Sequence, residues 1–374
     1  MTDTIRKLAT IQIIDNVAPI PKADQIEVVT VLGWSIVSRK GEFSKGDKCI
    51  LFEIDCILPK TKWSEFLIDK NHPDRPIRLR TKKLRGQLSQ GLALTPASIG
   101  VDGSVGDDLT EKLGIRKYDT QIADEQTLTI KQPKSKVLKY LMSYSVFRYC
   151  YLKLNSKEKG DYPIGVSHTD EENLQRCSEI ISNNFDKSFY ITEKCEGSSF
   201  TAFSNFERKW GFKRKVFGVC SRNIWIKTPN DSKYWQMFKK YNFEKIFKSY
   251  KCPITIQAEM IGIGIQGNIY KLDDIQLRVF NFIVDGKRLN YTDMTEQCKK
   301  HNLPVVPLID NNFIPCNHIP INDKDAIVKW GLDYSNGVSQ LYNTKKEGIV
   351  CRLNDNPVVS FKVRSPNYLI EHEE

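Results

Sequence analysis

Short β-strand patterns constrain the fold of this 374-residue sequence more than any other feature. After about residue 188, runs rich in aromatic and β-branched residues follow one another, among them "FYITEK", "SSFTAFSNF", "ITIQAEMIGIG", "LRVFNFIV", "GIVCRL" and "VSFKVRS". Parallel strands need long crossover connections, which are usually helices. Because few helical patterns separate these runs, the sequence predicts antiparallel sheets and an α+β fold.

The first part of the chain shows the same pattern at closer spacing. Strand-like runs such as "IEVVTVLGWSIVSRK" alternate with turn sequences such as "KGEFSKGD". Such spacing favours a small barrel, and we expect an oligonucleotide-binding (OB) fold. The stretch "RPIRLRTKKLRGQL" holds no acidic residue. We interpret Arg78, Arg80 and Lys82 in it as a nucleic-acid-binding surface, although a solvated strand face has the same pattern.

These patterns divide the chain into three parts. We expect an OB-like nucleic-acid-binding domain in residues 1–115, a basic and partly helical junction in 116–187, and a second, mainly β domain in 188–374. At the end of the junction, "TDEENLQRCSEIISNNF" predicts an amphipathic helix that begins at Thr169 or Asp170.

One further helix is predicted inside the third part. The segment "DSKYWQMFKKYNFEKIFKSY" has the apolar spacing of a single amphipathic helix. Trp235, Phe238, Phe243 and Phe247 form its expected core face.

The overall composition indicates a polyanionic partner and an intracellular location. The net charge is +11 and the pI about 9, which makes nucleic acid the first candidate for a partner. Ten cysteines occur without CxxC spacing, so we expect reduced thiols and no structural zinc. Apolar runs are too short for a membrane span, and the N-terminus lacks a signal-peptide core. We therefore expect a soluble, intracellular protein.

Charged residues stand at the ends of several strand patterns in the third part. They carry both signs and comprise Lys194, Arg222, Glu259, Arg278, Glu347, Lys362 and Arg364. Buried charge costs several kcal/mol unless it is paired. A single case could be a solvated strand end or a salt-bridge partner. The whole set predicts a site lined from two sheets.

The residues around Lys194 resemble a known superfamily. Lys194-Cys195-Glu196-Gly197 is similar to the KxxG motif of the covalent nucleotidyltransferases, which include ATP-dependent ligases and capping enzymes. The segments "SRN", "AEMIG", "RVFNF", "EGIV" and "FKV" resemble its later motifs in the same order. Near the N-terminus, "IPKADQIEVVTVLGW" and "FEIDCILP" resemble the OB domain of RNA ligases of the Naegleria and Deinococcus type.

The resemblance implies a fold and a reaction. The fold is an N-terminal OB-like β-barrel plus a C-terminal nucleotidyltransferase domain of two antiparallel sheets with flanking helices. In this family a neutral lysine amine attacks the α-phosphorus of ATP and forms a lysyl-AMP phosphoramidate. The implied nucleophile in this chain is Lys194.

The resemblance also implies roles for the neighbouring residues. Glu193 and Glu196 orient Lys194 and the ribose, Gly197 leaves room for the nucleotide, Arg222 contacts ribose or phosphates, Glu259 binds a ribose hydroxyl or a metal-bound water, Phe280 stacks on adenine, Glu347 holds the hydration shell of Mg²⁺ and Lys362 holds the α-phosphate. Arg364 stands where the superfamily commonly has a second lysine, so its role is open. The implied cofactors are ATP, as AMP donor, and Mg²⁺ or Mn²⁺ near Glu347 and Glu259.

Among the relatives, the motif order and the OB-like N-terminal segment favour an RNA ligase. Few residues follow Lys362, so we expect no C-terminal OB domain of the kind in DNA ligases and capping enzymes. The expected substrate is a nick in duplex nucleic acid with RNA at the 3′-hydroxyl side. We expect no membrane and no obligatory protein partner. The alternatives are a GTP-dependent capping guanylyltransferase and a non-catalytic nucleic-acid-binding protein.

The sequence also contains a motif that is typical of dinucleotide-binding folds. The segment "GIGIQG" is a literal GxGxxG after a strand pattern. That fold requires a helix to begin there, whereas the following "NIYKLDDIQLRVF" leads into another strand. We therefore expect a loop.

Overall fold

The computed structural model describes residues 6–118, 159–160, 162–163, 165–209, 212–227 and 231–372. The chain consists of two compact units. The first comprises residues 1–123, 323–333 and 366–374, and the second comprises 124–322 and 334–365. Most of the predicted junction, including all of 119–158, lies outside the described residues, so the helical content expected in that part is not described.

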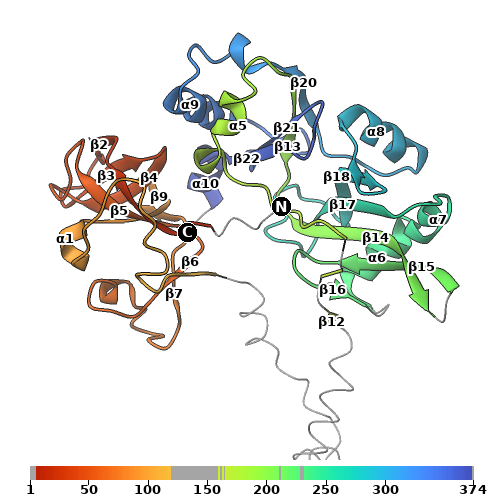
Figure 1. The fold of residues 1–374 in the computed structure, drawn as a ribbon, viewed down its shortest axis with the longest axis horizontal. Coiled ribbons are helices and arrows are strands. Elements are labelled where there is room, and N and C mark those ends of the chain that lie inside the picture. The colour runs from red at the N-terminus through yellow and green to blue at the C-terminus, as the bar shows by residue number, and fades with distance from the viewer. Residues whose placement is uncertain are drawn as a thin grey trace, which may run out of the picture. The chain divides into compact units, whose positions relative to one another are not determined.

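The N-terminal part of the first unit is built from short antiparallel strands (Figure 1). The first sheet has the order β1 (Ala9–Ile13), β5 (Lys48–Glu53), β10 (Gly91–Leu94), and the second has the order β2 (Asn16–Pro19), β3 (Ile26–Val31), β4 (Trp34–Arg39). The third sheet has the order β11 (Arg116–Lys117), β6 (Cys56–Leu58), β7 (Ile77–Arg78). The fourth sheet pairs β8 (Lys82–Leu84) with β9 (Gln87–Ser89). The short helices η1 (Glu65–Leu67) and α1 (Pro96–Ile99) lie between them in the sequence.

The expected closed barrel is not formed by the strand pairings of residues 6–118. Two hydrogen bonds connect β4 to the end of β9 and the residue that follows it. Gln90 N donates to Ser35 O, and Val37 N donates to the Ser89 hydroxyl. Isolated bonds of this kind connect the small sheets without continuing one ladder around a ring. The β-rich architecture itself agrees with the prediction.

Strand β5 explains how so small a unit has a core. Ile50 and Phe52 belong to one buried cluster, whereas Cys49 and Leu51 belong to another. Alternate residues of a strand point to opposite faces, so β5 is apolar on both sides. It packs against β1 residues such as Ile11 in the first cluster.

The second unit contains two antiparallel sheets (Figure 1). The seven-stranded sheet has the order β12 (Lys159–Gly160), β16 (Trp225–Ile226), β15 (Phe212–Cys220), β14 (Ser198–Lys209), β17 (Ile254–Ile261), β18 (Gln276–Val284), β19 (Lys287–Arg288). The four-stranded sheet has the order β20 (Leu308–Phe313), β13 (Phe189–Lys194), β21 (Gly348–Leu353), β22 (Ser360–Arg364). Antiparallel sheets are thus confirmed.

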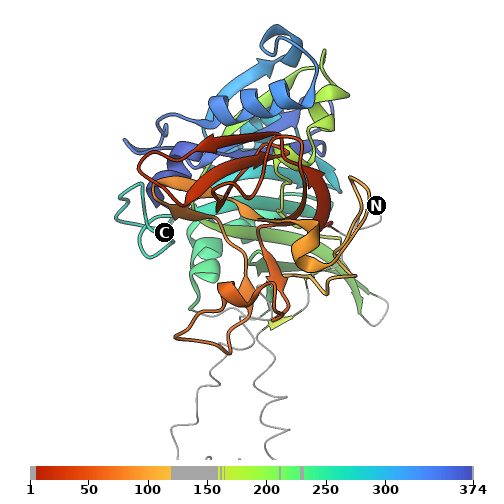
Figure 2. The same cartoon turned by 90° about the vertical axis from the view of Figure 1, so that its left-hand side faces the viewer.

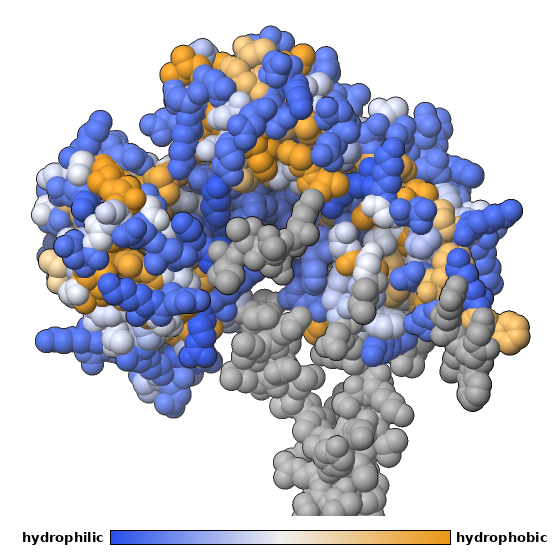
Figure 3. All heavy atoms as spheres, in the orientation of Figure 1, coloured by the Kyte–Doolittle hydropathy of each residue, from blue (hydrophilic) through white to orange (hydrophobic). Residues whose placement is uncertain are grey.

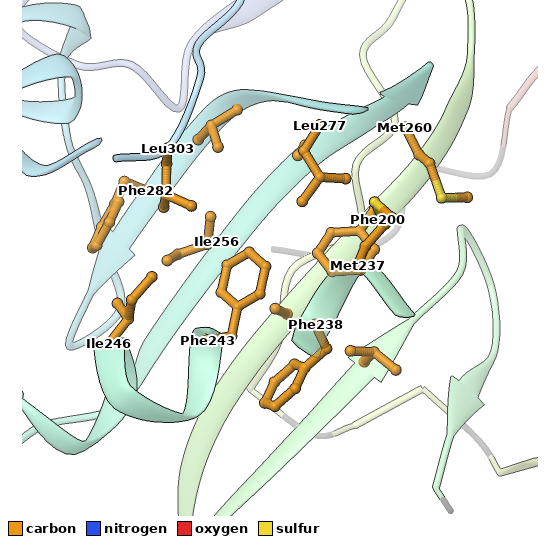
Figure 4. Close-up of a cluster of buried hydrophobic side chains, with 14 of the residues drawn as sticks. Phe200, Met237, Phe238, Phe243, Ile246, Ile256, Met260, Leu277, Phe282 and Leu303 are labelled. Carbon is orange, nitrogen blue, oxygen red and sulfur yellow. The ribbon is translucent and has the colours of Figure 1, made fainter. Parts of the chain in front are cut away.

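Helices pack against one face of the large sheet. Figure 4 shows Phe200, Ile256 and Leu277 of the sheet in contact with apolar side chains such as Phe238 and Phe243. These two come from α6 (Lys233–Lys240) and α7 (Phe243–Lys248), and α8 (Tyr291–Lys300) adds further residues to the same core. The opposite face of the sheet remains available to polar residues.

Two helix predictions need correction. The single helix predicted from Asp231 is two helices, because Asn242 adopts the left-handed conformation (φ 52°) and breaks the chain between them. Its predicted core face, Trp235, Phe238, Phe243 and Phe247, is buried as expected.

The helix predicted to begin at Thr169 or Asp170 is wrong. That sequence forms an extended segment followed by η3 (Leu174–Arg176) and the short α5 (Glu179–Ser182). Asp170 pairs with Arg222 instead of capping a helix. Tertiary partners therefore outweigh the local helical pattern.

The remaining helices are η4 (Pro315–Asn317), α9 (Lys324–Ser335) and α10 (Pro366–His372). No helix in the described part of the chain is long and apolar enough to cross a membrane. The visible face in Figure 3 is mainly hydrophilic, with apolar side chains in separate patches.

Candidate active site

Lys194 lies at the end of β13, beside a carboxylate. Its Nζ is 2.6 Å from Glu347 Oε2, and both side chains are largely shielded from solvent. Lys194 faces Gly348 in the β13–β21 register. An ideal Cβ on Gly348 (φ +155°) would lie 2.0 Å from Val363 O, so only glycine allows β21 and β22 to approach this closely. Strand packing therefore places the Lys194–Glu347 pair.

A second cation stands on the far side of Glu347. The Nε of Arg364, in β22, is 3.6 Å from Glu347 Oε1. Glu347 is buried, so its charge requires such partners. Arg364, whose role the sequence left open, is thus part of the charge network around Lys194.

Glu259 belongs to the large sheet and faces the same region. It pairs in register with Ser199 on β14 and with Arg278 on β18, so the three lie in one row across the sheet. Burial raises the pKa of Glu259 from 4.5 to about 8, and the nearby Lys194 partly opposes this shift. A carboxyl in this environment binds a cation or a hydroxyl more readily than it stays an isolated anion.

The pKa of Lys362 is also strongly shifted. Burial, with the adjacent Lys194 and Arg222, lowers the pKa of the Lys362 ammonium from 10.5 to about 8, while Asp170 opposes the change. Lys362 alternates with Phe361 and Val363 in β22, both of which are buried. Its cation is therefore partly desolvated, as a group that binds phosphate closely should be.

The turn after Lys194 packs tightly against β17. An ideal Cβ on Gly197 would lie 2.5 Å from Met260 O, so the glycine is required by packing, whatever space it leaves for a ligand. The 266–268 loop covers this turn: Gln266 Nε2 donates to Gly197 O and Gly267 N donates to Glu196 Oε1, each at 3.3 Å. Turns and bends occupy 262–270, so the expected loop is observed and no helix begins there.

Phe280 projects from a β-bulge. The β17–β18 register shifts between Val279 and Asn281, which leaves Phe280 as the extra residue. Its ring is half-buried against the small cluster that contains Cys195, and the guanidinium of Arg352 lies 5.9 Å from its centroid. Bulges commonly redirect a side chain next to a functional site.

Glu193 does not join the group around the Lys194 amine. Its carboxylate accepts hydrogen bonds from Ser339 Oγ at 2.5 Å and from Gln340 N at 2.8 Å. Burial raises the pKa of Glu193, and these bonds partly oppose the shift. Neighbouring residues of a strand face opposite sides, so Glu193 holds the 339–340 segment while Lys194 faces the site.

The segment 167–173, which we term the strap, contributes to the site in a way that its sequence did not predict. On the large-sheet side, Thr169 Oγ1 and Ser199 Oγ share a hydrogen bond of 2.9 Å. Asp170 forms an ion pair of 2.6 Å with Arg222. Ser199 is the neighbour of Glu259 in the polar row, so the strap is attached beside the site.

The strap is also attached to the small sheet. Glu171 Oε1 is 2.9 Å from the guanidinium of Arg352, which is 1% exposed, and Ser360 donates to the same carboxylate. Lys362 N donates to Glu172 O at 2.7 Å. A run of acidic residues after threonine has the composition of a helix cap, which is why the sequence suggested a helix instead.

The three basic residues predicted in the first unit differ in availability. Arg78 forms an ion pair of 2.6 Å with Asp55, and its guanidinium stacks 3.6 Å from the ring centroid of Tyr118. Arg80 and Lys82 are exposed. The structure thus leaves Arg80 and Lys82 as the more accessible cations of the predicted surface.

Comparisons with known proteins identify the family. Residues 8–96 match an OB-fold domain model and residues 187–364 match the RNA ligase model. A solved mutant of Naegleria gruberi RNA ligase with AMP and Mn is 30% identical, with 98% of this chain and 99% of that chain covered and a TM-score of 0.72. The chain belongs to the RNA ligase family. This RNA ligase is accordingly an ATP-dependent enzyme, and its N-terminal OB-fold domain is confirmed.

Two further solved structures are similar to this RNA ligase over nearly its whole length. Naegleria gruberi RNA ligase with PPi is 29% identical, with 98% of this chain and 99% of that chain covered and a TM-score of 0.71. A mutant of the same protein with ATP and Mn is 29% identical with the same coverage and a TM-score of 0.70. Comparison with curated protein sequences gives no match.

Proposed function

We propose that this RNA ligase seals nicks between a 3′-hydroxyl on RNA and a 5′-phosphate, through an AMP adduct on Lys194. The observation that carries the proposal is the contact between Lys194 and Glu347, with Glu259, Lys362 and Arg364 around it. One amine, two carboxylates and two further cations are the groups that adenylyl transfer needs.

In the first step the Lys194 amine attacks the α-phosphorus of ATP. An N–P bond forms, the bond from phosphorus to the pyrophosphate oxygen breaks, and the proton that the amine loses passes to solvent. In the free protein the amine is paired with Glu347, and Lys362 is a further cation of the same site. The solved relatives with ATP, AMP, Mn and PPi contain the reactants and products of such a step.

The residues present fit a divalent cation and a nucleotide. Glu347 and Glu259 are oxygen donors of the kind that Mg²⁺ and Mn²⁺ prefer, and Glu347 is buried while Glu259 is half-buried. A divalent cation held there would neutralise charge on the triphosphate. Lys362 would hold the α-phosphate, Arg222 the ribose or the other phosphates, and Phe280 would stack on adenine.

Two further transfers complete the reaction. AMP moves from Lys194 to the 5′-phosphate of the nick, and the 3′-hydroxyl then attacks that phosphate and releases AMP. The OB-fold domain, with Arg80 and Lys82 exposed, supports binding of the duplex. Each phosphoryl transfer needs a cation, either a metal ion or a charged side chain, to neutralise the developing charge.

Covalent labelling tests the first step. The purified protein, incubated with ATP and Mg²⁺ or Mn²⁺, should gain one AMP on the tryptic peptide that contains Lys194, as seen by mass spectrometry. Lys194→Ala should gain none, and Lys187→Ala, which removes an exposed lysine, should label normally. An unlabelled wild-type protein would contradict the proposal, and labelling of Lys194→Ala would contradict the choice of nucleophile.

Strand specificity needs a separate assay. Nicked duplexes with RNA or DNA on each side should be sealed efficiently only when the 3′-hydroxyl strand is RNA. Labelling by GTP in preference to ATP would instead indicate a capping guanylyltransferase. Binding without labelling would indicate a non-catalytic protein.

A further inference from the structure

The β14–β15 hairpin extends beyond the sheet to which it belongs (Figures 1 and 2). β14 pairs with β17 only over Ser198–Ser204, but it pairs with β15 as far as the Lys209–Phe212 partners. Its outer part is therefore a two-stranded ribbon. A two-stranded ribbon is only marginally stable on its own, so this one depends on the sheet and helices at its base.

One face of this ribbon is fixed to the protein. Lys215 Nζ donates to Phe247 O at 2.5 Å and to Tyr250 O at 2.6 Å, at the end of α7. Lys213 and Lys215 also lie over the ring of Phe206, with Nζ 4.2 and 5.5 Å from its centroid. These contacts hold the ribbon in an extended position and leave the ammonium of Lys213 near the surface.

The opposite face carries an exposed aromatic ring beside a cation. Phe212 is 80% exposed, and Arg214, two residues along the same face, is also exposed. Glu207 is opposite Arg214 in the register, yet within the described part of the chain no ion pair joins them. Arg214 can therefore bind another anion without breaking a salt bridge.

Protection of a free sheet edge does not explain this composition. Cations on an edge strand can prevent aggregation by charge repulsion. An exposed phenylalanine has the opposite effect, because its apolar ring favours association. Aromatic rings next to Lys or Arg are instead typical of surfaces that bind nucleic acid, where the ring contacts bases or sugars and the cations contact phosphates.

We propose that the end of the ribbon, with Phe212 and Arg214 on one face and Lys213 on the other, forms a second contact surface for the RNA substrate, away from the ligation site. The proposal rests on the proposed function for its ligand, which is the phosphodiester backbone of a duplex that contains the nick. Charge complementarity supports this ligand, since the surface is cationic and the duplex is a polyanion.

The distance along β14 predicts where on the duplex this contact falls. Ser199 lies beside Glu259 at the candidate active site, and Lys209 pairs with Phe212. About ten residues of strand separate them, which is ~33 Å at ~3.3 Å per residue. One turn of B-form DNA is ~34–36 Å, and the A-form helix of an RNA-containing duplex has a repeat of comparable length. The contact should therefore lie about one helical turn from the nick, on one side of it.

Binding of nicked duplexes of different lengths tests the proposal. The triple variant Phe212→Ala/Lys213→Ala/Arg214→Ala and the wild type are compared by fluorescence anisotropy, with duplexes extended by less than one turn or by about two turns on either side. We expect the variant to bind about tenfold more weakly than the wild type, and only to duplexes that are long on one particular side of the nick. The slope of log affinity against log salt concentration should be shallower for the variant by about 1 to 2, because two phosphate contacts are lost.

A matched control removes the same charge elsewhere. Lys299→Ala/Lys300→Ala changes two exposed lysines at the end of α8 and should not alter the length dependence. Equal affinity of wild type and triple variant for the longest duplexes would overturn the proposal, as would equal losses at all lengths. Labelling of Lys194 by ATP is measured in parallel. A wild type that fails to label contradicts the proposed function, while an unchanged length dependence contradicts only the hairpin contact.

Discussion

At the scale of single residues, Lys194 is notable for the charges of both signs around it. Glu347 contacts its amine directly at 2.6 Å. Lys362 and Arg222 add positive charge to the same site, and burial together with Lys194 and Arg222 lowers the pKa of Lys362 to about 8. Such an arrangement pairs the amine with a carboxylate when no substrate is present and gathers cations where phosphates would bind.

Glu259 should make stability depend on pH below about 8. Its pKa is raised from 4.5 to about 8, so between these values the folded protein binds more protons than the unfolded chain. Stability from this group is therefore lost as the pH rises through that window. Glu259→Gln should flatten the fall in Tm between pH 5 and 8, measured by differential scanning fluorimetry with chelator and without nucleotide.

The exposed Glu296 provides the control for that measurement. Glu296→Gln should retain the wild-type pH profile. If Glu259→Gln has the same profile as wild type, the protonation assigned to Glu259 is wrong.

Gly197 and Gly267 should differ in their tolerance of a methyl group. A Cβ at Gly197 would lie 2.5 Å from Met260 O, whereas at Gly267 the nearest atoms are at 3.8 Å. Gly197→Ala should lower the free energy of unfolding by about 1–3 kcal/mol in urea titrations, because strands must move apart. Gly267→Ala should cost less than about 0.5 kcal/mol. Similar values for the two variants would show that β17 does not restrict this turn.

At the scale of elements, the strap connects the two sheets of the second unit at the site. It bonds to Ser199 of the large sheet and to Arg352 of the small sheet. Arg352 in turn lies near the ring of Phe280. The position of this element thus affects residues proposed for the ribose, adenine and phosphate, although the strap holds no predicted site residue.

Glu171 and Glu172 are adjacent in the strap but should differ greatly in their effect on stability. Glu171 pairs with Arg352, whose side chain is 2% exposed, whereas the Glu172 side chain is 60% exposed and pairs with Arg176. Glu171→Ala leaves a buried guanidinium without its carboxylate and should cost about 3 kcal/mol or more in urea unfolding. Glu172→Ala should cost less than about 1 kcal/mol.

The two variants also separate folding from activity. Where Glu171→Ala still folds at low temperature, the KM for ATP in the labelling reaction should rise, because Arg352, the cation beside Phe280, loses the carboxylate that positions it. Equal stability of the two variants would mean that Arg352 is not held by Glu171.

At the scale of the whole molecule, the two units carry different parts of the proposed function. The second unit contains all residues proposed for adenylyl transfer, and the first contains the OB-fold domain. The net charge of +11 suits a protein that binds duplex nucleic acid. Loss of cations from the first unit should therefore affect substrate binding and leave the first chemical step intact.

Arg80 and Lys82 allow this division to be measured. Arg80→Ala/Lys82→Ala should weaken binding of a nicked duplex several-fold at low salt, with little change in the rate of Lys194 labelling by ATP. Arg78 is left in place because its pair with Asp55 and its stacking on Tyr118 support the local fold. Equal losses in the two assays would argue against a nucleic-acid surface on this unit.

Much of the fold could be predicted because local patterns and tertiary structure agree. Strand β5 is apolar on both faces, and each face is buried in its own cluster. The aromatic residues between Trp235 and Phe247 that the helical period places on one face are buried as well. The order of the charged strand ends also identified Lys194, Glu259, Glu347 and Lys362 as one group. These features depend on residues close together in the sequence or on motif order.

Other features were decided only by tertiary contacts. The strap became extended because Ser199, Arg222 and Arg352, all distant in sequence, bind its polar side chains in place of helix N–H groups. Glu193 turned away from Lys194 because strand geometry directs neighbours to opposite faces. The sequence by itself therefore determined which residues carry charge and which strands form. Only the folded chain decided which charges meet, since pairing energy depends on distance and burial.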